Sequence, residues 1–226
     1  PDERERFSFD LFLGLSQLIS RSSTAQITMN YKHSDGYLSD PYKAIAVVGG
    51  SGVLSDQRPD TKDQVSILAR YRHHFEPVAG SLHLDYRFYA DDWNVIAHTA
   101  EIGWYQNVFG IFTVTPGVRW YSQSKADFYD TLVRNDVTEA SRASRSSDYR
   151  LSGYGAISWK IKAEVELTDL FEYQPPGWLE ALGVSEGFDL IAALSYDRYL
   201  SAGHRGLANQ TAVHDAPALS LSRTAP

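Results

Sequence analysis

Apolar and polar side chains alternate with a period of two along most of the chain, and the longest such stretch is Ser81–Gln106. Apolar residues recur at every second position on both sides of a polar centre, Asp91–Asn94. Because a period of two is typical of β-strands, the stretch predicts a long antiparallel hairpin. If paired residue numbers sum to 186, Asp85 lies opposite Glu101. The hairpin then has one apolar face and one charged face.

The same alternation predicts further strands on both sides of the hairpin. They are expected at Phe7–Ser16, Ala25–Lys32, Val65–His74, Phe112–Tyr121, Arg150–Lys160, Ala163–Thr168 and Phe188–Tyr199, with a tenth at Ala216–Arg223. A short turn is expected at Gln17–Ser23, and a tight reversal after Lys160. Long polar stretches rich in Gly, Pro, Asp or Ser predict loops at 34–63, 122–147 and 172–187.

Composition narrows the class of protein. The 226 residues suit a single domain spanning 1–226. A net charge of −7 without a basic stripe makes nucleic acid an unsuitable partner. The chain has no cysteine, which excludes disulfides and thiolate chemistry and suits a protein of the oxidising cell envelope. No apolar run reaches 18 residues, so no transmembrane helix is expected, although barrel strands escape this criterion.

Loop lengths and aromatic positions favour a membrane barrel over a soluble β-barrel or sandwich. Short and long connections alternate, as in outer-membrane barrels, and large aromatics are expected near both rims of the apolar face, among them Trp104, Trp120 and Trp159. The predicted fold is all-β: an antiparallel up-and-down transmembrane β-barrel of about 12 strands when complete, with nine or ten in this chain. The abrupt start at Pro1 suggests that N-terminal strands are missing.

The charged face of the strands is expected to line the barrel interior. Its predicted band of charges consists of Arg70, Arg72, Asp85, Arg87, Glu101 and Arg119. Extending the pairing puts Arg70 opposite Asp85, Arg72 opposite His83, and Arg119 close to Thr99 and Arg87. Two interpretations remain open: a ladder of charges that stiffens a narrow lumen, or a selectivity band for an anionic solute.

Catalytic and metal chemistry have little support in the sequence. There is no nucleophile elbow, zinc helix, phosphate loop or dinucleotide fingerprint. His98 lacks a carboxylate to orient it on its own face, and His73 and His74 point to opposite faces, so they cannot share a metal ion. His74 with His83 is possible as a pair but lacks a third ligand. The loop aspartates Asp35, Asp40, Asp91 and Asp92 could form a hard-cation cluster, although loop aspartates are usually solvated. We therefore expect no catalytic residue, metal or cofactor.

Two loops are expected to meet at the barrel mouth. Gly36 permits a tight exit from its strand, and Ser39-Asp40-Pro41 predicts a turn that lets two tyrosines fold over the opening. The mouth residues are predicted to be Tyr37, Asp40, Tyr42, Lys43, Asp91, Asp92 and Trp93. A structural constriction and a site that grips a partner or solute both remain open.

Four segments resemble a known bacterial family. They are GYLSDPYK at Gly36–Lys43, Arg58-Pro59, LDYRFYADDWNVIAHTAEI at Leu84–Ile102, and PGVRWYSQSKADFY at Pro116–Tyr129. Together they are similar to a family catalogued as a domain of unknown function and regarded as an outer-membrane β-barrel. The combination of GYLSDPYK with DDWN-x-x-x-HT-x-E carries the resemblance. It implies a fold and a location but no settled activity, and the tail after Gly203 departs from the closing strand of such barrels.

These observations lead to an expected role in the bacterial outer membrane. The leading hypothesis is a narrow, charge-lined channel or transport protein, or a membrane anchor for periplasmic or surface partner proteins. The alternatives are an outer-membrane enzyme with a site on the loops or rim, and a soluble β-barrel binding protein. Expected partners are outer-membrane lipid, partner proteins and a small solute, without nucleic acid.

Overall fold

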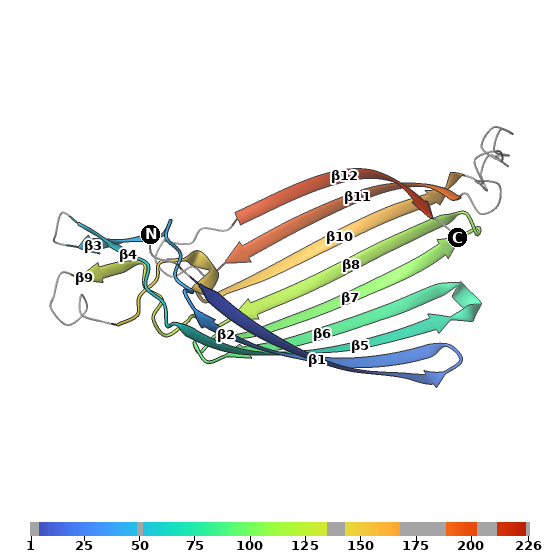
Figure 1. Ribbon diagram of the computed structural model, residues 1–226. Coiled ribbons are helices and arrows are strands. Elements are labelled where there is room, and N and C mark those ends of the chain that lie inside the picture. Colours follow the sequence, from blue (N-terminus) through green and yellow to red (C-terminus); the bar gives the residue numbers. More distant parts are fainter. Residues whose placement is uncertain (1–4, 49–51, 135–142, 168–188, 203–211, 225–226) are drawn as a thin grey trace, which may run out of the picture.

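The computed structural model describes residues 5–48, 52–134, 143–167, 189–202 and 212–224. Its main feature is a nine-stranded antiparallel sheet (Figure 1). In sheet order, the strands are β1 (Arg6–Ser20), β2 (Ser23–Gly36), β5 (Thr61–Phe75), β6 (Gly80–Asp91), β7 (Ile96–Val108), β8 (Phe112–Gln123), β10 (Tyr154–Glu166), β11 (Asp189–Ala202) and β12 (Ala212–Thr224). Apart from short strands within loops, each strand pairs with the next along the chain, so the topology is up-and-down as expected.

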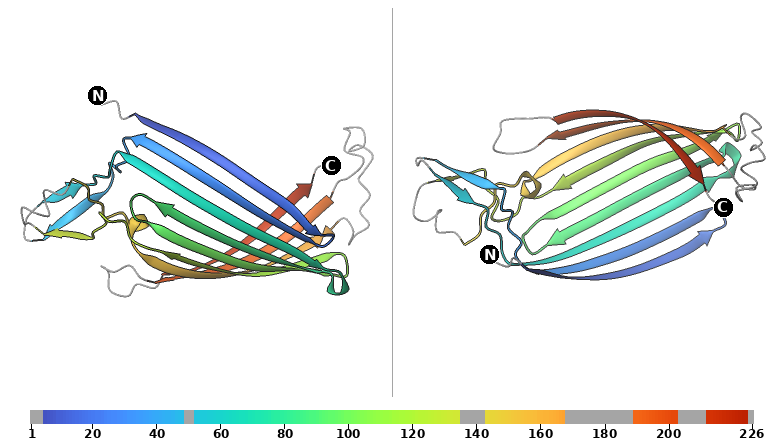
Figure 2. Two further views of the ribbon diagram at one scale, coloured as in Figure 1. Left: turned by 90° about the horizontal axis from the view of Figure 1, so that it is seen from below. Right: turned by 45° about the horizontal axis from the view of Figure 1, so that its top comes forward.

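The sheet is strongly twisted and curved (Figure 2). Among the described residues, β1 and β12 form its two edges, and each pairs with one neighbour only. No helix in this part of the chain is long and apolar enough to cross a membrane. The all-β prediction is therefore confirmed as a curved antiparallel sheet with two edges.

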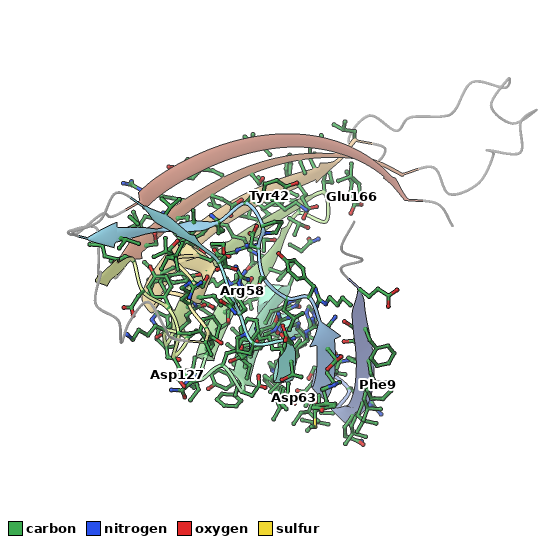
Figure 3. The ribbon with its side chains drawn as sticks, turned by 60° about the vertical axis from the view of Figure 1, so that its left-hand side comes forward. Phe9, Tyr42, Arg58, Asp63, Asp127 and Glu166 are labelled. Carbon is green, nitrogen blue, oxygen red and sulfur yellow. The ribbon has the colours of Figure 1, made fainter. Side chains whose placement is uncertain are left out.

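The two faces of the sheet differ as the alternation predicts. Large apolar side chains on one face remain open: Leu84 is 37%, Ile102 50% and Val118 42% exposed. On the opposite face, Thr115 is only 4% exposed. Figure 3 shows the apolar residue Phe9 pointing away from the space around which the sheet curves. We call the polar side the concave face, and the apolar side the outer face.

The central hairpin is formed as predicted. Strands β6 and β7 pair with residue numbers that sum to 186, so Asp85 lies opposite Glu101. The turn between β5 and β6 is a short 3-10 helix, Glu76–Val78, and it places Arg70 opposite Asp85. The tenth strand, expected at Ala216–Arg223, is also present, as the longer β12.

The expected reversal after Lys160 is wrong. β10 runs without interruption from Tyr154 to Glu166 and pairs with β8 as far as Val165 opposite Phe112. The stretch from Ala156 to Glu166 contains no turn-forming Gly, Pro, Asn or Asp, and its apolar positions keep the same phase through Ile161. Two predicted strands are therefore one. Trp159 consequently lies mid-strand, and the prediction that it belongs to an aromatic rim is also wrong.

The loop predictions need three corrections. The turn expected at Gln17–Ser23 is shorter, because β1 continues to Ser20 and β2 begins at Ser23. The loop expected at 34–63 contains β3 (Ala44–Val48) and β4 (Val53–Ser55), and the loop expected at 122–147 contains β9 (Leu132–Arg134). The expected loop 172–187 lies outside the described residues. β10, which precedes this segment, ends at the end of the sheet that carries the short turns, and β11, which follows it, begins there. The other two long loops lie at the opposite end of the sheet.

Candidate functional site: the charged concave face and the cap

A row of ionisable residues crosses the concave face from strand to strand. The register puts Arg70 of β5 opposite Asp85 of β6, and Asp85 opposite Glu101 of β7. Glu101 in turn lies opposite Arg119 of β8. We expected Arg119 beside Thr99, but the β7–β8 turn centres on Gly110, whose φ is 77°, and this shifts the register by two residues. Four of the six residues of the predicted band therefore lie in one continuous row, with Arg72 and Arg87 in the flanking rows.

The two carboxylates of this row are neutralised by cations that lie diagonally across the sheet. Arg72, not Arg70, forms the ion pair with Asp85, with 2.5 Å between Nη1 and Oδ1. Lys160 of β10 forms the pair with Glu101, at 3.0 Å between Nζ and Oε1. No role was expected for Lys160, because the expected reversal placed it at a turn. Lys160 occupies a polar position in an alternation that continues past it, and this pattern could have placed its side chain on the charged face.

One glycine, Gly117, makes room for this diagonal contact. Lys160 crosses over Gly117 of β8 to reach Glu101 of β7, and a Cβ at Gly117 would lie 3.2 Å from its Cε. Gly103 of β7 lies opposite Gly117, where its own Cβ would have no contact closer than 3.8 Å. The absence of a side chain at Gly117 therefore lets a long cation cross β8.

The loops at one end of the sheet interlock into a cap, which consists of the described residues of 37–60 and 124–153 and the β6–β7 tip at 92–95. β3 of the first loop pairs with β9 of the second, so the two loops share one small sheet. Gln57 and Arg145 exchange two backbone hydrogen bonds of 2.9 and 2.6 Å. Figure 3 looks toward this end, where Arg58 lies over the space that the sheet surrounds. The cap thus covers one end of the concave face.

The cap has a small hydrophobic core built around Trp93. The ring of Trp93 is 6% exposed and meets Phe128 edge-to-face, with 5.1 Å between centroids. Its Nε1 donates to the Thr61 carbonyl at 3.0 Å. The other members are Val95, Ala126, Tyr129 and Leu151. The tip of the central hairpin is therefore joined to the second loop by packing.

Asp91 organises the hairpin tip. One carboxylate oxygen accepts from the backbone N–H groups of Trp93 and Val95, at 3.1 and 2.9 Å, which fixes the turn. The other oxygen binds Lys62 Nζ at 2.9 Å. The same ammonium lies 4.3 Å from the centroid of the Trp93 ring. The DDWN motif is therefore a folding element that holds the cap core against the sheet.

A buried carboxylate joins the two cap loops. Asp148 of the second loop has no exposed surface. Its Oδ2 accepts from Arg58 of the first loop at 3.0 Å and from Arg150 Nη2 at 2.6 Å. Arg58 also binds Asp56 at 2.8 Å, and Arg150 binds Asp40 at 3.3 Å. The network therefore ties three acidic side chains to two guanidiniums.

The electrostatics of Asp148 follow from these contacts. Burial would raise the pKa of its carboxyl group, but hydrogen bonds from the side chain and backbone of Arg150, and from Arg58, outweigh burial and lower the pKa to about 2. Asp148 in turn raises the pKa of Arg150. The Asp148–Arg150 pair is thus charged throughout the physiological pH range.

The predicted mouth residues take several different roles. Asp40 belongs to the charge network, and Lys43 lies 5.5 Å from the centroid of the Tyr149 ring. The backbone N–H of Tyr37 donates to Glu5 at 2.9 Å, while Asp92 accepts from the backbone of Asp63 at 3.1 Å. The expectation that Tyr42 folds over the opening is wrong, because its side chain is 93% exposed.

Several functional candidates escaped the sequence prediction. They are Asp56, Arg58, Lys62, Asp148, Arg150 and Lys160. The contacts that join different segments are distant in sequence: Arg58 and Asp148 are 90 residues apart, and Lys160 and Glu101 are 59 apart. Alternation shows at most which face a residue such as Lys160 occupies, so it could not identify these partners. Among the described residues, no group of three or more His, Cys, Asp or Glu could hold a metal ion, so Asp35, Asp40, Asp91 and Asp92 do not form the cation cluster considered above.

Comparison with known proteins yields one match. No curated protein and no solved structure is significantly similar to the chain. A family described as "Protein of unknown function (DUF3570)" matches residues 2–175. The matched region begins before β1 and extends past β10, so it contains the central hairpin and both cap loops. The chain therefore belongs to this family, whose description assigns no function.

Proposed function

We propose that the chain is an integral β-barrel of the bacterial outer membrane and that its sheet forms most of the barrel wall. The observation that carries this proposal is the exposed apolar outer face. On β1 alone, Phe7 is 64%, Leu13 57% and Leu15 66% exposed. Water-facing surfaces rarely hold apolar areas that extend across a whole sheet, whereas lipid acyl chains cover them favourably.

Strand length and polarity support the same assignment. The nine strands have 12 to 15 residues, and a tilted strand needs about 9–11 to cross a bilayer. An unpaired sheet edge is costly in lipid, so the proposal requires that the two edge strands, β1 and β12, be paired or covered in the membrane. A soluble barrel would instead turn Leu84, Ile102 and Val118 inward.

The proposed role is a narrow passage for small solutes. The concave face would line the lumen, where Asp85–Arg72 and Glu101–Lys160 form fixed ion pairs. Such pairs fill and stiffen a lumen, and they favour a narrow path over a wide pore. The cap over one mouth supports controlled rather than free passage.

The cap also favours a second role, that of a membrane anchor. Its two loops share a sheet, a hydrophobic core and a buried charge network, so they form an ordered surface beyond the strand ends. An ordered surface of this kind can dock periplasmic or surface proteins.

Detergent dependence and conductance test these proposals. The protein should be monodisperse only in detergent or lipid, and a chain that is monodisperse without either is not a lipid-facing barrel. In planar bilayers, a passage should give small single-channel steps. Stable insertion without steps would reject the passage and leave the anchor.

A cap lock shows whether solute crosses the capped mouth. Gln57 and Arg145 exchange both backbone hydrogen bonds, so their Cα atoms lie about 5.5 Å apart, within disulfide range. The chain has no cysteine, so Gln57→Cys/Arg145→Cys introduces a single pair. Oxidation should lower conductance reversibly in the double variant, while Gln57→Cys alone should not respond. An unchanged conductance in the oxidised double variant would mean that the cap does not control the path.

A further inference from the structure

A cavity of about 300 Å³ lies where the cap meets the concave face. Four basic side chains line it: Lys62, Arg87, Arg119 and Arg150. The single acidic residue in its lining is Asp91. An adjoining cavity of about 350 Å³ shares Arg119 and Tyr121 with it and continues along the concave face. This concentration of positive charge is unusual in a chain with a net charge of −7.

Two of the four cations are already neutralised. Lys62 binds Asp91 at 2.9 Å, and Arg150 binds Asp148 at 2.6 Å. Glu101 is the neighbour of Arg119 in the register, but its carboxylate binds Lys160. Within the described residues, neither Arg87 nor Arg119 forms an ion pair with a carboxylate. Among the described residues, these two guanidiniums of the cavity therefore have no carboxylate as an ion-pair partner.

The register brings these two guanidiniums to the same place. Arg87 of β6 lies opposite Thr99 of β7, and Thr99 lies opposite Tyr121, two residues along β8 from Arg119. The two arginines are thus on strands that flank β7, about 10 Å apart across the sheet. Long side chains on both sides of one strand can approach a single small ligand above Thr99.

We propose that this cavity binds a small organic or inorganic anion, with Arg87 and Arg119 as its principal ligands. The planar fork of a guanidinium matches carboxylate and phosphate oxygens, and a volume near 300 Å³ is at the lower end for ligand sites. The surrounding positive charge excludes cations. This inference rests on the proposed barrel, because it takes the concave face as an interior, and it makes the solute of the passage an anion.

The test is anion binding to purified protein in detergent, with inorganic phosphate and succinate as separate probes. Arg87→Gln and Arg119→Gln should each weaken binding of the favoured probe by about 10-fold or more. Arg70→Gln is the matched control, because Arg70 also lies on the concave face without an ion pair in the described region and does not line this cavity. Tetramethylammonium at equal ionic strength should show no binding.

Several results would overturn the site. They are the absence of binding by both anions, equal affinity in wild type and both variants, or an equal loss in Arg70→Gln, which would indicate a general charge effect. If Arg119→Gln does not fold, Arg119→Lys keeps the charge but loses the fork, and binding should still weaken several-fold. Conductance without anion binding would reject the site alone, whereas anion binding without conductance would reject the passage alone.

Discussion

The charge on Asp148 should hold the cap closed, and Asp148→Asn removes that charge with little change of shape. The pKa of Asp148 falls from an ordinary value of 3.8 to about 2 in the folded protein. Because one pKa unit corresponds to ~1.36 kcal/mol, the charge stabilises the closed cap by about 2–3 kcal/mol at neutral pH. The variant should therefore raise the equilibrium constant for cap opening about 60-fold.

Hydrogen exchange measures this opening directly. The backbone N–H groups of Gln57 and Arg145 bond to each other's carbonyl groups across the two loops, so they exchange when the cap opens. Peptides that contain these amides should exchange about 60-fold faster in Asp148→Asn, while amides of the central hairpin should be unaffected. Asp35→Asn is the matched control, since Asp35 is an exposed carboxylate near the same sheet end. An acceleration below about 3-fold would refute the role assigned to the Asp148 charge.

Three further predictions test the pH response, a close contact and the cap core. Because the pKa of Asp148 is lowered in the folded protein, its charge stabilises the closed cap above about pH 4, and this stabilisation is lost as the pH falls through about 2. In acid, the hydrogen-exchange rate of the cap amides in Asp148→Asn should therefore approach the rate in the wild type. A Cβ at Gly80 would overlap the Trp104 ring, so Gly80→Ala should lower the free energy of unfolding in urea by about 1–3 kcal/mol. There is more room at Gly103, so Gly103→Ala should lower that free energy by less. Equal losses in the two variants would contradict the clash. Phe128→Ala should destabilise the cap by about 3–5 kcal/mol and make its loops sensitive to protease while the sheet stays intact; uncut loops would show that the cap does not depend on this core.

The concave face is where the sequence prediction and the structure agree most closely. Alternation and one turn were enough to place Arg70 opposite Asp85 and Asp85 opposite Glu101. The ion pairs themselves were not predictable, because long side chains reach diagonally. Arg72 forms the ion pair with Asp85, and Lys160 forms the ion pair with Glu101 by reaching across Gly117. Backbone register therefore follows from local pattern, whereas partner choice depends on side-chain reach and on space.

Three properties could be predicted from the sequence: the all-β class, the central hairpin and the separation of an apolar from a charged face. These properties follow from the alternation of apolar and polar residues with a period of two, which can be recognised within each strand by itself. Tertiary structure alone decided that β10 is one strand, that the loops contain strands, and that Asp148 joins Arg58 and Arg150. The physical reason is distance along the chain: Arg58 and Asp148 are separated by 90 residues, and only the folded sheet brings their loops to the same end.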